Sequence, residues 1–326
     1  MMRTIAAMVI LAVTVMVCGA VAAPASQTPS MPPTAQSATP NTPAGTQSNT
    51  PGTPPLNNAK SRASGEGRKT AGPDNAAGGL TVSGEKAPDA GTVKPFHDIE
   101  FVWVPAGSFV PGLEGAGKTV VTSLGGREEW FSDEAPRPTE RFSRGFWMSK
   151  TEITRRQWSR VMGNQPWAEH NPDDQLDAPA TWVTWKEAAA FAKTLAQQDE
   201  PACRLPSENE WEYACRAGAA TLFPFGDDPA GLDECAWYRG TAPDGKLRPV
   251  AGKKSNAWGL CDMLGNAWEW CADTYGGEPS GEGAELRVIR GGSANQPATF
   301  TRPTVRLGRS PKEPGARIGF RVVREP

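Results

Sequence analysis

The aromatic residues of this chain are confined to its C-terminal part. No Phe, Trp or Tyr occurs before Phe96, whereas all 12 tryptophans follow it. The segment from Pro24 to Lys94 is rich in Pro, Thr, Ser, Ala, Gly and Asn. Such a composition cannot bury enough apolar surface to offset its chain entropy, so residues 23–95 are predicted to be a disordered linker. Residues 96–326 are long enough to form one large domain with a substantial core.

The N-terminus has the composition of an export signal. Arg3 precedes the apolar run "IAAMVILAVTVMV", and the small residues of "GAVAAP" follow. The run is too short for a comfortable membrane span and has the length of a signal-peptide core. We therefore expect residues 1–22 to be a cleaved signal peptide, and the mature protein to be periplasmic or secreted without a membrane span. Lipidation at Cys18 and an uncleaved N-terminal anchor are the alternatives, although Val17 is bulkier than a lipidation signal prefers.

Charge and histidine content exclude several classes of function. The formal net charge of -2 gives no reason to expect nucleic acid or an anionic membrane surface as a partner. Two histidines, His97 and His170, are too few for a three-histidine metal centre, and no Cys-x-x-Cys spacing is present.

The number of cysteines in the predicted domain indicates whether a disulfide is expected. Removal of the signal peptide would leave five of them. They are Cys203, Cys215, Cys235, Cys261 and Cys271. In an oxidising compartment we expect at least one disulfide and one remaining thiol, whose pairing the sequence does not specify.

Local patterns predict a mixed α+β domain. Residues 101–112 alternate around a Pro-Ala-Gly turn and indicate a hairpin, and residues 141–154 are a second strand-like stretch. Three capping-box pairs predict helix starts. They are Thr154 with Gln157, Thr184 with Glu187, and Ser207 with Glu210, and Gly163 and Gly218 are the predicted stops of the first and third helices. After Gly218 the helical period ends, and short segments separated by Gly and Pro turns continue to the C-terminus.

An ordered set of motifs resembles the formylglycine-generating enzyme family, also called the sulfatase-modifying factor domain. The resemblance covers about residues 101–324 and implies a variant of the C-type lectin-like fold, with few regular elements and structural calcium. The motifs are "VWVPAGSFVPG", "GFWMSKTEITRRQW", "PATWVTWKEAAAFAKTL", "RLPSENEWEYACRAG", "FPFGDD", "NAWGLCDMLGNAWEWCAD", "RVIRGGS" and "IGFRVVR".

The motif "DMLGNAWEWCAD" is the candidate calcium site. Its Gly and Asn allow the backbone to fold back and bring Asp262 and Glu269 together, as calcium requires several oxygen ligands. A helix-capping Asp beside a surface Glu is the alternative interpretation of the spacing. The resemblance implies side-chain ligands from Asp262 and Glu269 and main-chain ligands from Gly265 and Ala267. A second calcium site of the family is doubtful, because Asp244 matches one ligand but Ala236 replaces an Asn.

The segment after "RVIRGGS" lacks the cysteines that the resemblance implies. Active members of the family oxidise a cysteine of a sulfatase peptide and hold a copper ion with two cysteines just beyond this motif. Those positions correspond here to about Gln296 and Thr301, whose amide and hydroxyl groups cannot replace the soft thiolates that bind Cu(I). We therefore do not expect copper. Cys261 and Cys271, beside the candidate calcium turn, are better explained by packing or by a disulfide.

The most consistent functional hypothesis is a binding or accessory module without oxidase activity. Its candidate cleft would hold a peptide, a glycan or a partner protein, and a basic rim would favour carboxylates or sulfates. The candidate cleft residues are Arg290, Ser293, Asn295, Gln296, Thr301 and Arg306, and the rim would be formed by Arg290, Arg302, Arg306 and Arg309. Arg306 and Arg309 could instead pair with acids in the core.

The alternative hypothesis is a maturation enzyme of the sulfatase-modifying factor type with a non-standard site. Whether the chain is an enzyme stays open at this point. Ser293 is the suspected nucleophile, but no activating His or Lys is visible near it in the sequence. The iron-dependent relatives of the family use a His-rich centre, which two histidines cannot supply.

Overall fold

The computed structural model describes residues 86–170, 175–196, 202–276 and 285–326. The predicted signal peptide and most of the predicted linker lie outside these residues. Strand β1 (Val93–Phe96) pairs with β2 (Ile99–Val104), and the ring of Phe96 contacts those of Phe101 and Trp147. The composition predicts a domain boundary at Phe96. In the structure, residues before Phe96 already belong to strand β1 of the folded domain.

A five-stranded antiparallel sheet forms one side of the domain, with strand order β1-β2-β5-β11-β6. The other three strands are β5 (Phe146–Ser149), β6 (Cys203–Arg204) and β11 (Val323–Arg324). Side chains alternate across β2, so that Phe101 and Trp103 join one apolar cluster, and Val102 and Val104 join another. Burial on both faces explains why this segment is apolar at every position from 101 to 104.

The hairpin predicted for residues 101–112 is wrong. Both edges of β2 are occupied by β1 and β5, and β3 (Gly107–Phe109) pairs instead with β4 (Glu140–Phe142) in a separate two-stranded sheet. The chain does bend at Ala106 between two strand segments, but a local pattern of this kind does not specify which edge of a sheet a strand occupies.

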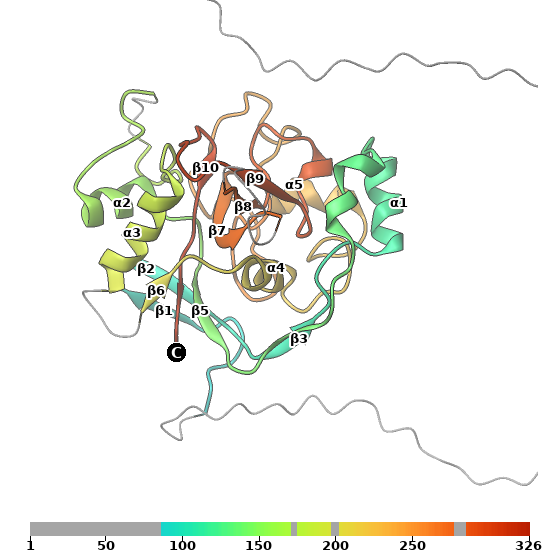
Figure 1. Ribbon diagram of the computed structural model, residues 1–326, viewed down its shortest axis with the longest axis horizontal. Helices are drawn as coiled ribbons and strands as arrows, with labels where there is room; N and C mark the ends of the chain where they lie inside the picture. Colours follow the sequence, from blue (N-terminus) through green and yellow to red (C-terminus); the bar gives the residue numbers. More distant parts are fainter. Residues whose placement is uncertain (1–85, 171–174, 197–201, 277–284) are drawn as a thin grey trace, which may run out of the picture. The chain divides into compact units, whose positions relative to one another are not determined.

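The second large sheet has four strands in the order β10-β7-β8-β9 (Figure 1). They are β7 (Trp268–Thr274), β8 (Arg287–Arg290), β9 (Arg306–Arg309) and β10 (Ile318–Gly319). Strand β10 runs parallel to β7, and the other pairs are antiparallel. The candidate Arg-Gly-Gly-Ser segment begins at Arg290, the last residue of β8.

The three predicted helices are confirmed. Helix α2 (Arg155–Met162) and helix α4 (Glu208–Arg216) both begin with complete capping boxes, at Thr154 and Ser207 respectively. Helix α3 (Trp185–Ala196) begins after Thr184, whose N–H donates to Glu187 Oε2 over 2.8 Å. Side chains within three residues of each helix start accept hydrogen bonds from its first free N–H groups. The position of the start can therefore be predicted from the local sequence.

Further helices were not predicted. Helix α1 (Gly115–Ser123) contains two glycines, which weaken the helical signal, and α5 (Leu232–Cys235) has a single turn. Short 3-10 helices occur at Glu128–Trp130, Ser132–Glu134, Pro229–Gly231 and Ala298–Phe300. None of the described helices combines the length and the apolar composition needed to cross a membrane.

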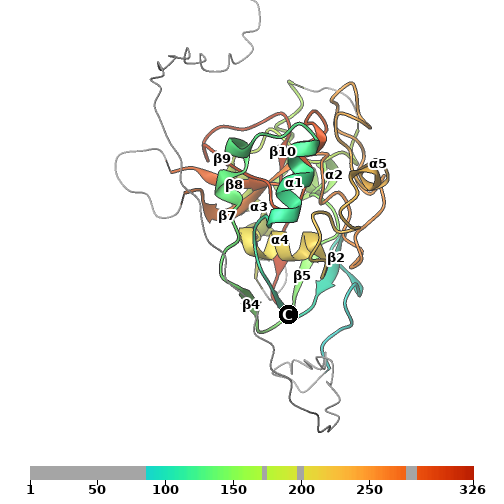
Figure 2. The ribbon, with the colours of Figure 1, turned by 90° about the vertical axis from the view of Figure 1, so that its right-hand side faces the viewer.

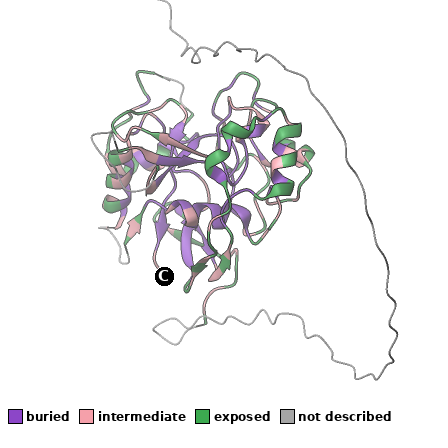
Figure 3. Cartoon of the chain, turned by 45° about the vertical axis from the view of Figure 1, so that its right-hand side comes forward, coloured by how far each residue is buried: buried purple, intermediate pink, exposed green. Residues whose placement is uncertain are grey.

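Helix α4 lies between the two large sheets (Figures 1 and 2). Its Trp211 and Ala214 pack with Val102 and Met148 of the five-stranded sheet and with Val288 of the four-stranded sheet. Figure 3 shows that buried residues concentrate in the strands and in this central region, with exposed residues on the outer loops and helices. The helix is thus buried on nearly all sides, and its charged residues need partners inside the core.

The expected disulfide is not found among four of the mature cysteines. Cys215, Cys235, Cys261 and Cys271 carry free thiols in the described part of the chain. Cys215 belongs to α4 and Cys271 to β7, and both are packed into the apolar cluster around Trp211. Their burial is therefore explained by packing.

Candidate functional site

Two glycines turn the chain at the end of β8. Gly291 and Gly292 have φ values of +95° and +83°, which side-chain-bearing residues rarely adopt. A Cβ atom on Gly292 would lie 2.4 Å from the carbonyl oxygen of Phe300, and one on Gly291 would lie 3.0 Å from the Trp211 ring. The space beside these glycines is therefore occupied by Phe300 and Trp211 of the same chain.

Arg290 is fully buried and cannot form part of a basic rim. Its Nη2 atom donates to Glu212 Oε2 over 2.6 Å, and its Nη1 atom donates to the carbonyl oxygens of Pro303 (3.1 Å) and Val305 (2.8 Å). Burial alone would lower the pKa of the guanidinium, but Glu212 and Glu208 outweigh burial and raise it. Arg290 thus stays charged and ties the segment 303–305 to α4.

Arg302 and Arg306 are also engaged with acids. Arg302 is buried against Glu134, and burial both lowers the pKa of Arg302 and raises that of Glu134. Arg306 is mostly buried, and its Nη2 atom lies 2.9 Å from Glu208 Oε2. The predicted basic rim is therefore incorrect at Arg290 and Arg302, and the structural alternative holds at Arg306, because each guanidinium is desolvated and paired.

The loop that follows Gly292 is held by its own polar groups. Ser293 is 1% exposed, and its Oγ atom donates to Asn295 Oδ1 over 2.8 Å. The hydroxyl of Thr301, which is fully buried, donates to the Pro297 carbonyl over 3.2 Å. Gln296 accepts from the Arg239 N–H through its main-chain oxygen. Asn295 and Gln296 are half-buried, so of the six candidate cleft residues these two and Arg306 keep partial exposure.

This arrangement offers little for catalysis. The hydroxyl of Ser293 meets an amide oxygen, and a nucleophilic serine needs a general base that takes its proton. Among the described cysteines near α4, burial raises the pKa of the thiols of Cys215 and Cys271, so neither favours the thiolate that coordinates copper. The loop 294–305 contains no cysteine.

The candidate calcium turn lies beside a buried ion pair. Glu269 accepts from Arg321 Nε (2.7 Å) and Nη2 (2.8 Å), and from Trp211 Nε1 (2.6 Å). Its carboxylate therefore already has hydrogen-bond donors on both oxygens. Asp244, considered for the second calcium site, pairs with Arg248 at the surface over 2.7 Å.

Asp262 and Glu152 bring uncompensated oxygens into the same region. Asp262 Oδ2 accepts from the Ala251 N–H, whereas Oδ1 has no partner among the described residues. Glu152 is fully buried, and neither of its carboxylate oxygens has a partner within that part of the chain. Burial, followed by Asp262 and Glu269, raises the pKa of Glu152. Buried carboxylate oxygens without donors fit a bound cation, so Asp262 meets this requirement better than Glu269.

Sequence reasoning missed the acids that neutralise the buried arginines. They are Glu134, Glu208 and Glu212. It also missed Glu152, a buried acid whose carboxylate oxygens have no hydrogen-bond partner among the described residues. The available signal was the spacing of Glu208 and Glu212, one helical turn apart on either side of the core residue Trp211. Acids on the apolar side of a helix require cationic partners, and several arginines of the C-terminal motifs supply them.

The fold defines a C-type lectin-like α+β domain with few regular elements. Residues 87–326 match the model of the sulfatase-modifying factor enzyme 1-like domain. The chain belongs to this family.

Similar sequences include both active and inactive relatives. The inactive C-alpha-formylglycine-generating enzyme 2 of Mus musculus is 34% identical over 168 residues, which are 46% of this chain and 50% of that protein. The formylglycine-generating enzyme of Streptomyces coelicolor is 34% identical over 171 residues, or 45% of this chain and 52% of that protein. The chain thus spans about half the length of these relatives.

Solved structures share the fold. PvdO from Pseudomonas aeruginosa is 30% identical, with a TM-score of 0.62, and the match covers 74% of this chain and 100% of PvdO. Treponema denticola variable protein 1 is 24% identical with a TM-score of 0.59, over 72% of this chain and 99% of that one. The second likeness concerns the fold alone.

Proposed function

We propose that this protein is an exported binding or accessory member of the sulfatase-modifying factor family that does not oxidise cysteine. The observation that carries the proposal is the segment 290–305. Arg290 and Arg302 form ion pairs inside the protein, and the hydroxyl of Ser293 donates to an amide oxygen. The segment contains no thiol. A segment fixed in this way maintains the scaffold of the family without the ligands for copper.

The ligand would be a peptide, a glycan or a protein partner. The half-buried Asn295 and Gln296 and the partly exposed Trp130 ring beside Phe300 supply polar and aromatic contacts in this part of the surface. Aromatic rings with nearby amides are a common composition of recognition surfaces. The match to an inactive relative in mouse is compatible with this proposal.

Mass spectrometry of a Cys-x-Pro-x-Arg peptide tests the absence of oxidase activity. The peptide is incubated with the protein, oxygen, a thiol reductant and Cu(I), and the Streptomyces coelicolor enzyme serves as the positive control. We expect conversion to the aldehyde only in the control. Copper-dependent conversion by this chain would overturn the proposal and favour the alternative, a maturation enzyme with a non-standard site.

A peptide and glycan array probed with the labelled protein tests binding. Gln296→Ala with Asn295→Ala removes the polar contacts, and Glu313→Gln, at an exposed residue outside the segment, controls for a general effect of surface substitution. We expect a bound class whose signal falls with the double variant alone. Equal binding by all three proteins would contradict a recognition role for this segment.

We also propose that the turn from Asp262 to Glu269 binds a structural calcium ion. Asp262 would supply a carboxylate, and Gly265 and Ala267 would supply main-chain oxygens. Glu269, the other ligand that the family resemblance implies, is already held by Arg321 and Trp211, so the proposal rests on Asp262. The unpartnered Oδ1 atom of Asp262 supports this, since a calcium ion would compensate its buried charge. When bound, the ion would fix the turn that positions Trp268 and Trp270 in the core.

A further inference from the structure

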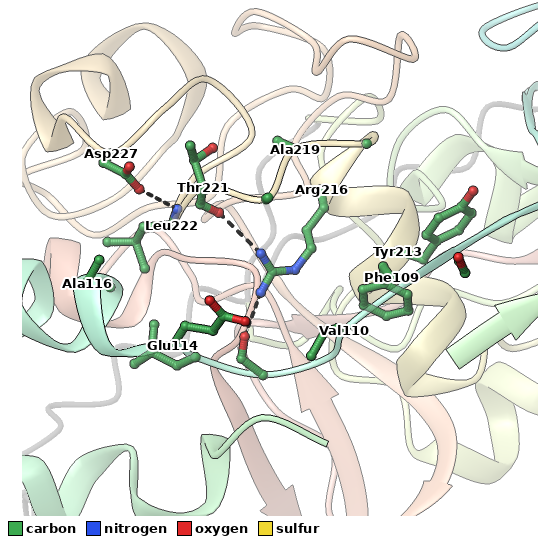
Figure 4. A pocket seen from close by; sticks show the side chains of 16 residues that line it. Phe109, Val110, Glu114, Ala116, Tyr213, Arg216, Ala219, Thr221, Leu222 and Asp227 are labelled. Atoms are coloured by element: carbon green, nitrogen blue, oxygen red, sulfur yellow. Dashed lines mark hydrogen bonds between the residues drawn. The ribbon is translucent and has the colours of Figure 1, made fainter. Parts of the chain in front are cut away.

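A cavity of about 390 Å³ lies between α1 and the C-terminal end of α4, and none of its lining residues belongs to the segment 290–305. This volume falls in the range of small-molecule sites, which begins at about 300 Å³. Figure 4 shows Phe109, Val110 and Tyr213 along one side, with Leu222 and Asp227 toward the other. The walls combine aromatic and aliphatic side chains with a few polar groups, as expected for a ligand site.

Two carboxylates with exposed side chains line this cavity. Glu114 precedes α1 and forms no side-chain cap, so its carboxylate is not committed to the helix. Asp227 Oδ1 accepts from the Leu222 N–H over 2.7 Å, which fixes the direction of its side chain. Neither carboxylate has an ion-pair partner within 4.0 Å among the described residues.

The one cationic side chain of the lining, Arg216, is held by hydrogen bonds on its protein side. Arg216 Nε and Nη2 donate to Glu212 Oε1 over 3.0 and 2.9 Å, and its other donors reach the carbonyl oxygens of Gly112 and Thr221. Arg216 shares the carboxylate of Glu212 with Arg290. The lining itself still carries two carboxylates against this one guanidinium, so its net charge is negative.

The sequence beside this cavity resembles a phosphate-binding loop. Residues 112–119 read "GLEGAGKT" and match the spacing of a phosphate-binding loop. However, the Gly112 N–H donates to Glu212 Oε1 (2.9 Å) and the Leu113 N–H to the Glu134 carbonyl (2.6 Å). Helix α1 already begins at Gly115, so the free loop that would surround a phosphate is not formed. Glu114 and Asp227 would also repel a phosphate.

We propose that this cavity binds a small organic cation, namely an amine carried on an apolar or aromatic body. The apolar body would pack against Phe109, Val110 and Tyr213, and the ammonium group would lie toward Glu114 and Asp227. Burial of the body supplies affinity, while the carboxylates select the sign of the charge. This site is independent of the proposed function at residues 290–305, so either proposal can fail without the other.

Three probes of similar shape and different charge test the proposal. Benzylamine, benzyl alcohol and benzoate are titrated by ligand-observed NMR at low salt, with inorganic phosphate and ATP as further probes. We expect benzylamine to bind most tightly and to weaken as salt is added. Preference for benzoate, phosphate or ATP, or no binding of benzylamine at any soluble concentration, would overturn the proposal.

Variants locate the binding. Glu114→Gln and Asp227→Asn each remove one charge, and Asp227→Asn keeps an oxygen for the Leu222 N–H. Each should weaken benzylamine about two- to fivefold, the range of an exposed ion pair, and leave benzyl alcohol unchanged. Ala219→Phe should block both probes by filling the cavity. Glu313→Gln, an equal charge change outside the lining, is the matched control, and thermal melting verifies that every variant is folded.

Equal weakening by Glu313→Gln would mean that general surface charge attracts the amine. Unchanged benzylamine affinity in both Glu114→Gln and Asp227→Asn would mean that these two carboxylates do not select it. Either result would contradict the proposed site.

Discussion

Arg290 and Glu212 form an ion pair of 2.6 Å in which both side chains are essentially inaccessible to solvent. Glu212 also accepts from Arg216 and from the Gly112 N–H, so a single carboxylate joins β8, α4 and the backbone at Gly112. The pair explains why the motif arginine next to Gly291 lies inside the core rather than on its surface.

Arg290→Met should destabilise the fold by about 3–5 kcal/mol, because it leaves the Oε2 atom of Glu212 and two carbonyl oxygens without their Arg290 donor. The free energy of unfolding in urea measures the loss. Arg156→Gln, which breaks an exposed pair with Asp177, should change stability little. Similar losses for both variants would show that Arg290 is not a buried structural residue.

Acid should destabilise the protein through Glu208. Burial pushes the pKa of Glu208 up, but Arg290, Arg306 and Arg137 outweigh it and hold the pKa below the ordinary value of 4.5. The unfolded chain therefore binds a proton first, so this contribution is complete above pH 4.5 and is lost as pH falls through the lowered pKa. Urea midpoints from neutral pH to about pH 3 should fall less steeply for Glu208→Gln than for the wild type. Parallel profiles for the two proteins would exclude this role.

Alkylation should distinguish the thiols. Burial raises the pKa of all three thiols, but Cys215 and Cys271 are inaccessible, whereas Cys235 is half-buried. Iodoacetamide should therefore modify Cys235 before Cys215 and Cys271 in the native protein, as peptide mass spectrometry can follow. In denaturant all three should react. Early labelling of Cys271 in the native state would show that β7 is less tightly packed than described.

Calcium should raise the melting temperature by about 5–10 °C at a hundredfold excess over its Kd. Asp262→Asn tolerates the left-handed backbone at this position but removes the charge, and it should reduce the calcium response. Asp177→Asn, at an exposed acid, is the control. An identical shift in Asp262→Asn, or no effect of a chelator on the wild type, would contradict the calcium proposal.

Features that depend on neighbouring residues could be predicted from the sequence. The capping boxes at Thr154 and Ser207 satisfy helix N–H groups within three residues, so the helix starts were confirmed. The ordered motifs identified the family and the C-type lectin-like fold, since their order records the arrangement of the whole domain. The lack of cysteines between residues 294 and 305 is likewise a property of the sequence alone.

Only the tertiary structure decided what the charged residues do. From the sequence we expected Arg290 in an open cleft. In the structure it is buried against Glu212, which lies 78 positions earlier on α4. The partner of Arg302, Glu134, lies 168 positions earlier. The hairpin at residues 101–112 failed for a related reason, because strand pairing joins distant segments. Local pattern fixes where helices begin, whereas burial and charge compensation depend on which distant segments the fold brings together.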